Sequence, residues 1–142
     1  MSTTYTTPPT SDSARGKPRR VGVEVELAGM NVADLAQCVA ECLEGTIDAD
    51  SICETSATVA TRFGPFRTEL DAAPLQNRAY LRPLEKIGIG DPRLLDEVEH
   101  SVVSLASEFV PVEIVTPPIP WNRLHELDEL WNRVREDGGL GT

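Results

Sequence analysis

The sequence is poor in the residues that several common kinds of protein depend on. It has three cysteines in 142 residues, too few and odd in number for a disulfide framework, which favours a reducing cytoplasm. No apolar run approaches the roughly 18 residues of a transmembrane helix, and the N-terminus has no apolar core of a secretory signal. We therefore expect a cytoplasmic protein without a membrane anchor.

Positive charge is also scarce. The 13 lysines and arginines face 23 aspartates and glutamates, which gives a formal net charge of −10. Nucleic-acid phosphates require a basic protein face, and anionic membranes attract basic segments, so the charge balance argues against both partners. The hydrophobic fraction of 40% is ordinary for a globular protein, and the length is sufficient for one domain with a core.

Two parts of the chain differ in composition. Residues 1–18 are rich in threonine, serine and proline and lack apolar periodicity, which predicts a disordered leader. Residues 19–142 carry the periodic patterns of a folded domain. The clearest is an amphipathic helix after Asn31, which can act as its N-cap, with Gly45 just past its end.

The remaining patterns predict a mixture of strands and helices. They indicate a strand over about 20–27, and then a hairpin of 57–63 and 66–71 around Gly64-Pro65. A helix opened by Asp91-Pro92 and a strand over 110–116 follow. The last predicted element is a helix from about Trp121 that ends at Gly138-Gly139. This order favours an α+β fold, a mostly antiparallel sheet with helices packed on one face.

The stretch from Arg19 to Leu27 is the most informative. Valines and Leu27 alternate with Gly22, Glu24 and Glu26, so in a strand both glutamates point to the face opposite the apolar side chains. The two Cα atoms would lie about 7 Å apart, at about 3.3 Å per residue. A bound cation would relieve the repulsion between the two carboxylates, which suggests a strand that faces a metal.

Two later strands repeat this pattern. Glu69 and Asp71 share the polar face of one, and Glu113 lies on the polar face of the other. If these strands are neighbours of the first, the open face of the sheet is a cluster of carboxylates. Hard cations such as Mg²⁺ prefer oxygen ligands and are often completed by nucleotide phosphates. The alternative interpretation is an ordinary solvated sheet face.

The cysteines allow a second metal hypothesis. Cys38 and Cys42 lie four residues apart on the predicted helix and could share a metal with Cys53. No Cys-x-x-Cys motif or nearby histidine pair supports such a site, so free thiols are the expectation.

Three segments together resemble the amidoligases, a family of the carboxylate–amine ligase superfamily that also contains glutamine synthetase and glutamate–cysteine ligase. The segments are Val21-Gly22-Val23-Glu24-Val25-Glu26, Phe66-Arg67-Thr68-Glu69-Leu70-Asp71 and Pro111-Val112-Glu113-Ile114-Val115-Thr116-Pro117-Pro118. The last, followed by a helix with tryptophan and leucine, is the most distinctive. The resemblance covers residues 19–142 and implies part of a glutamine-synthetase-like ligase fold.

The resemblance implies an ATP- and Mg²⁺-dependent ligase. A small-molecule or peptide carboxylate would be phosphorylated to an acyl phosphate, which an amine acceptor then attacks to form an amide. Carried over by position, Glu24, Glu26, Glu69 and Glu113 match the family's metal-binding and catalytic acidic residues, with Asp71 as a further candidate. Arg67 could contact a phosphate of ATP, or it could simply pair with Glu69 or Asp71.

The sequence also departs from the family pattern. Leu27 stands where an aromatic residue is common, and family members continue past Gly141-Thr142 with strands that carry histidine and asparagine motifs. We therefore expect the N-terminal part of such an enzyme. The alternative is a catalytically inactive, truncated module that associates with another chain, or with itself, through an open sheet edge. A metal-dependent hydrolase ranks last because no histidine ligand or base is evident.

Overall fold

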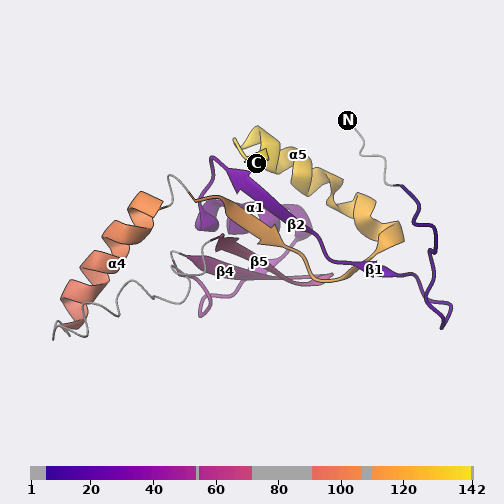
Figure 1. Cartoon of the computed structure of the whole chain (residues 1–142), viewed down its shortest axis with the longest axis horizontal. Coiled ribbons are helices and arrows are strands. Elements are labelled where there is room, and N and C mark those ends of the chain that lie inside the picture. Colours follow the sequence, from indigo (N-terminus) through magenta and orange to yellow (C-terminus); the bar gives the residue numbers. More distant parts are fainter. Residues whose placement is uncertain (1–5, 54, 72–90, 107–109, 142) are drawn as a thin grey trace.

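The structure is a computed structural model that describes residues 6–53, 55–71, 91–106 and 110–141 (Figure 1). The elements in chain order are β1 (Arg20–Val21), β2 (Glu24–Ala28), α1 (Val32–Leu43), β3 (Thr46–Ile47), β4 (Ser56–Thr61), β5 (Gly64–Leu70), α4 (Pro92–Ala106), β6 (Val112–Val115), β7 (Ile119–Pro120), the 3₁₀ helix η2 (Trp121–Leu127), α5 (Asp128–Glu136) and β8 (Leu140–Gly141).

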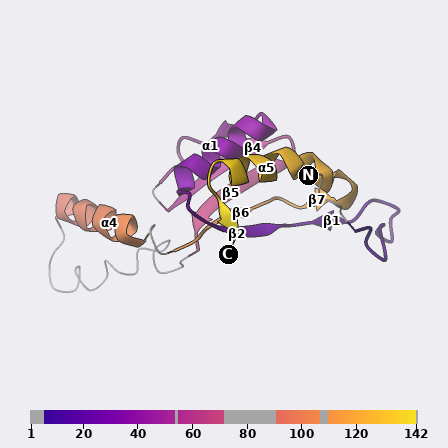
Figure 2. The same cartoon turned by 90° about the horizontal axis from the view of Figure 1, so that it is seen from above.

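Six strands of the described residues form one sheet in the order β3-β4-β5-β6-β2-β8, and every neighbouring pair is antiparallel. Helices α1 and α5 lie over the same face of this sheet (Figure 2). The predicted α+β class is therefore confirmed. The irregular segment predicted for residues 72–91 falls, except for Asp91, outside the described residues.

The core lies between the sheet and the two helices. Its fully buried side chains include Phe66 and Leu70 of β5, Val112 and Ile114 of β6, Leu35 and Val39 of α1, and Leu130 of α5. Thr68 is buried with them, and its hydroxyl donates to the Val32 carbonyl at 3.1 Å, which satisfies a polar group inside the core. The inward and outward faces predicted for β5 and β6 are confirmed.

Helix α1 begins and ends as its sequence indicates, with one difference. The Asn31 side chain accepts from the Asp34 backbone N–H at 2.8 Å, as an N-cap does. At the other end Glu44, not Gly45, takes the left-handed conformation, with φ of 51°. Gly45 is needed for space, because a Cβ there would lie 2.9 Å from the carbonyl oxygen of Ala60 and 2.9 Å from a methyl of Val59.

The hairpin turn lies two residues earlier than predicted. Thr61 pairs with Gly64, so Arg62-Phe63 form the turn and Gly64-Pro65 belong to β5. The Thr61 hydroxyl brackets the turn, accepting from the Phe63 N–H and donating to the Gly64 carbonyl. The guanidinium groups of Arg62 and Arg123 lie 5.0 and 4.8 Å from the centre of the Phe63 ring, and this contact with a distant segment favours the turn position.

The predicted strand over residues 20–27 is divided. β1 pairs with β7, and β2 pairs with β6, with Gly22-Val23 between them. On the partner side Pro117-Pro118 separate β6 from β7, and proline cannot continue a ladder of hydrogen bonds. Val21 consequently lies outside the core and is 37% exposed.

The last two predicted helices behave differently. Gly138, with φ of 99°, ends α5 as expected, and the chain returns to the sheet as β8, which the sequence analysis did not predict. Helix α4 begins with the Arg93 N–H donating to the Asp91 carboxylate, but it stands apart from the sheet (Figures 1 and 2). Its Leu94 and Leu105 are 43% and 65% exposed, so α4 does not help to cover the sheet.

Among the residues that the structure describes, no helix combines the length and the apolar character needed to cross a membrane.

Candidate functional site

Three of the predicted site residues form a row across the open face of the sheet. Glu113 of β6 is directly opposite Glu26 of β2 on one side and Glu69 of β5 on the other. Directly opposed residues of antiparallel strands share a face and have Cβ atoms about 4.5–5.5 Å apart. The condition left open by the sequence, that these strands be neighbours, is met, because β6 lies between β5 and β2. We call Glu26, Glu69 and Glu113 the glutamate row.

Glu113, at the centre of the row, has a raised pKa. The pKa of Glu113 is raised to about 7, first by partial burial and then by a hydrogen bond with the Glu69 side chain and by the charges of Glu69, Asp71 and Glu24. Two carboxyl groups can share a hydrogen bond only when one of them carries a proton. The centre of the row therefore holds a proton at a pH where an ordinary glutamate is ionised.

The other predicted residues flank the row. Glu24 lies one position along the same face of β2, opposite Val115, and its side chain is exposed. Asp71 follows β5, and its backbone N–H donates to the Pro111 carbonyl at 2.9 Å. Arg67 lies opposite Val115 from the other side, and its guanidinium is 3.6 Å from the Glu69 carboxylate with 56% of the side chain exposed. Arg67 thus pairs with Glu69, the simpler of its two predicted roles.

The row suits a divalent cation in chemical character. Carboxylate oxygens are the ligands that Mg²⁺ prefers, and a cation could replace the proton held between Glu113 and Glu69. In the part of the chain that the structure describes, no group of three or more acidic, histidine or cysteine side chains is placed to hold a metal ion. The arrangement fits Mg²⁺ held by one or two carboxylates, with water or phosphate oxygens as the remaining ligands.

The structure adds two hydroxyl residues that the sequence analysis did not single out. Ser56 is directly opposite Glu69 and Thr58 is directly opposite Arg67, so both extend the same face onto β4. Only the correct register of the hairpin would have indicated these two residues. Placing the turn at Gly64-Pro65 shifts the pairing of β4 with β5 by four residues. The face therefore combines carboxylates, one guanidinium and hydroxyl groups over four strands.

The cysteines are free thiols, as expected, and do not gather at one point. Cys38 is buried on α1, and burial raises its pKa to about 12. Cys53 is exposed beside the sheet, and its sulfur lies 3.2 Å from the Ser56 hydroxyl and 3.3 Å from that of Thr55. Although burial opposes it, these hydrogen bonds lower the pKa of the Cys53 thiol.

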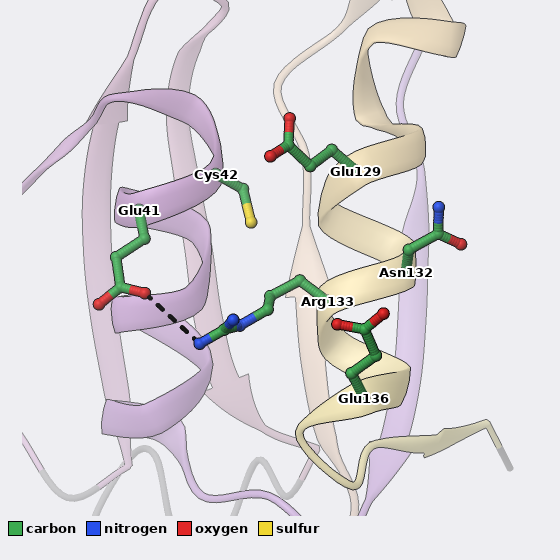
Figure 3. A pocket seen from close by; sticks show the side chains of 6 residues that line it. All are labelled: Glu41, Cys42, Glu129, Asn132, Arg133 and Glu136. Carbon is green, nitrogen blue, oxygen red and sulfur yellow. Dashed lines mark ion pairs between the residues drawn. The ribbon is translucent and has the colours of Figure 1, made fainter.

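A second polar region lies away from the glutamate row. Helices α1 and α5 border a hollow of about 460 Å³, and Figure 3 shows Glu41, Cys42, Glu129 and Arg133 around it. Arg133 is already held by Asp137 at 2.8 Å and lies 3.9 Å from Glu41. Both helices cover the opposite face of the sheet from the row. Arg133, the cation among the described residues that line this hollow, is therefore already paired, and the row remains the candidate site.

Comparison with known proteins identifies one family. A family model described as "Putative amidoligase enzyme" matches residues 17–142. No curated protein and no solved structure matches the chain. The matched range includes every member of the glutamate row and its flanking residues.

Proposed function

Because the chain belongs to the amidoligase family, we propose that it contributes to an ATP- and Mg²⁺-dependent carboxylate–amine ligase and that the glutamate row is its metal-binding centre. The observation that supports this most strongly is the register of Glu26, Glu113 and Glu69 on three neighbouring strands. An acidic protein without a basic cleft can hold a nucleotide through a cation that bridges carboxylates and phosphates.

The residues of the row have distinct proposed roles. Glu69 and Glu113 would hold Mg²⁺, with water and phosphate oxygens as its remaining ligands, and Glu26 and Glu24 of β2 would add negative charge beside it. The bound cation would neutralise phosphate charge. Arg67, exposed beside the row and already near Glu69, would turn toward a phosphate oxygen when the nucleotide arrives.

The reaction proceeds in two transfers. The substrate carboxylate attacks the γ-phosphorus of ATP, which releases ADP and leaves an acyl phosphate. The amine then attacks the acyl carbon, the bond from carbon to the phosphate oxygen breaks, and an amide, inorganic phosphate and a proton are formed. The crowded carboxylates disfavour additional negative charge at the face unless a cation is present, which couples nucleotide binding to Mg²⁺.

The experiment that tests this proposal follows an isotope. Carboxylate substrates labelled with ¹⁸O, drawn from amino acids and other small carboxylic acids, are incubated with MgATP and amino-acid or polyamine acceptors. A ligase of this kind transfers one labelled oxygen to inorganic phosphate as the amide forms. Glu113→Ala should abolish the transfer and Glu136→Ala, on the exposed side of α5, should leave it intact. Absence of ATP turnover with every pair of substrates would refute the proposal.

One observation favours the second candidate, a non-catalytic module that associates with another chain. Among the described residues, β8 pairs with β2 at Leu27 and Ala28, and a sheet edge with unpaired backbone groups is a place where another chain can add a strand. We further propose a cytoplasmic location, supported by the free thiols of Cys38, Cys42 and Cys53.

A further inference from the structure

Two thiols lie side by side on the surface of α1 that turns toward α5. Cys38 and Cys42 are four residues apart, a spacing that places Cβ atoms about 5–6 Å apart on one side of a helix. Their side chains are hydrogen-bonded to each other. Cys38 is 3% exposed, and Cys42 is half-buried. The pair therefore offers one shielded sulfur and one that solvent can reach.

Each thiol lines a hollow on this side of α1. Cys42 lines the hollow of about 460 Å³ between α1 and α5, and Figure 3 shows its sulfur directed toward α5. Cys38 lines a neighbouring hollow of about 260 Å³, which the thioether residue Met30 also lines. Glu41 and Arg133 border both hollows. A small ion can therefore reach the thiol pair without any opening of the core.

The described residues that line the two hollows are mostly acidic. Their carboxylates are those of Asp34, Glu41, Glu129, Glu136 and Asp137, and their guanidinium is that of Arg133. A rim of this charge attracts cations. Burial raises the pKa of both thiols, to about 12 for Cys38, whereas the Arg133 guanidinium acts in the opposite direction on both. Arg133 would therefore stabilise the negative charge of a pair of thiolates.

The two sulfur atoms select the kind of cation. Thiolates are soft ligands that favour Cu(I) and Zn²⁺ over the hard ions Mg²⁺ and Ca²⁺. A structural Zn²⁺ takes four protein ligands, and among the residues that the structure describes no group of three or more acidic, histidine or cysteine side chains is placed to hold a metal. Cu(I) is stable with two thiolates, so it is the cation that this pair suits.

We propose that Cys38 and Cys42 bind one soft monovalent cation, Cu(I), as a two-coordinate dithiolate on the side of α1 that faces α5. Each thiol gives its proton to water, and each sulfur then donates an electron pair to the metal. Copper keeps its charge of +1, so the step needs neither an oxidant nor a reductant. The complex carries one net negative charge, which Arg133 balances. The site lies across the sheet from the glutamate row and does not depend on ligase activity.

A competition for copper tests the proposal. The reduced 142-residue chain is mixed without oxygen with Cu(I) and the coloured chelator bicinchoninate, and the absorbance reports the copper that the chelator loses. We expect the wild type to take one equivalent and Cys42→Ser to bind Cu(I) at least about tenfold more weakly, because serine does not replace a thiolate. Cys53→Ser makes the same change at the thiol outside the pair and should bind as the wild type does.

Two measurements on the wild type do not depend on a variant that folds. X-ray absorption at the copper edge should show sulfur as the nearest neighbour, with two sulfur atoms per copper. A pH indicator in weak buffer should report two protons released for each Cu(I) bound, because both thiols must ionise. Urea unfolding of Cys42→Ser, read by tryptophan fluorescence, establishes that this variant is folded before its copper binding is compared.

Several results would overturn the proposal. Equal copper binding by the wild type and a folded Cys42→Ser would show that the pair is not the site. Nitrogen or oxygen as the main copper neighbour would indicate adsorption of a cation to an acidic protein. Loss of binding in Cys53→Ser, or a dimer in sedimentation that forms only with copper, would assign the ion to thiols of another part of the chain or of two chains.

Discussion

Replacing Glu113 by glutamine should stabilise the protein above neutral pH. A carboxyl whose pKa is raised to about 7 binds more protons in the folded than in the unfolded state between its ordinary value of 4.5 and about 7. The free energy of unfolding therefore falls as pH rises through this window, and the full penalty is present above about pH 7. Glutamine is neutral and its amide can donate to Glu69, so the penalty is absent from Glu113→Gln.

The size of this penalty in the free energy of unfolding follows from the difference between the raised pKa of Glu113 and its ordinary value. At 1.36 kcal/mol per pKa unit the penalty is about 3 kcal/mol, and because Glu113 is only partly buried, solvent screening reduces it to about 1–2 kcal/mol. Urea unfolding followed by tryptophan fluorescence should show Glu113→Gln more stable than the wild type by this amount near pH 8, with the difference vanishing near pH 4.5.

A matched variant distinguishes the effect of the crowded carboxylates from the general effect of removing one negative charge. Glu136→Gln removes the same charge from an exposed position on α5 and should change stability by less than about 0.5 kcal/mol at either pH. If Glu113→Gln were destabilising near pH 8, or followed the same pH dependence as Glu136→Gln, the account of crowded carboxylates would be wrong.

Three further predictions concern the scaffold and the thiols. Gly45→Ala should destabilise by about 1–3 kcal/mol in urea unfolding, because its Cβ would meet the carbonyl of Ala60; an unchanged midpoint would contradict the packing described. Asn31→Ala should lose about 1 kcal/mol by the same assay through loss of the N-cap, whereas Asn31→Ser should not. In the folded protein Cys53 should react with iodoacetamide before Cys38, since Cys38 is buried with a pKa of about 12; mass spectrometry of digests that found Cys38 modified first would refute this.

Much of the candidate site could be predicted because it depends on local alternation. A strand places every second side chain on one face, so the sequence alone assigned Glu24 and Glu26 to one face and Val25 and Leu27 to the other. The structure agrees, with Leu27 buried and both glutamates exposed. Alternation does not decide which strands are neighbours, and that pairing is what turns separate glutamates into a row.

The features that escaped prediction depend on contacts between distant segments. The turn at Arg62-Phe63 is accompanied by packing of Arg123, from η2, on the Phe63 ring. The division of the first strand follows from the prolines of its partner strand, more than 90 residues later. A window of neighbouring residues contains neither signal.

The central claim is that the glutamate row holds a divalent cation, and Mn²⁺ tests it directly as a paramagnetic substitute for Mg²⁺. Electron paramagnetic resonance measures free Mn²⁺ as protein is added in the presence of a non-hydrolysable ATP analogue. The account predicts that the wild type and Glu136→Gln bind Mn²⁺ alike and that Glu113→Gln binds it at least about tenfold more weakly, a loss of about 1.4 kcal/mol. Equal binding by all three proteins, or none by the wild type, would contradict it.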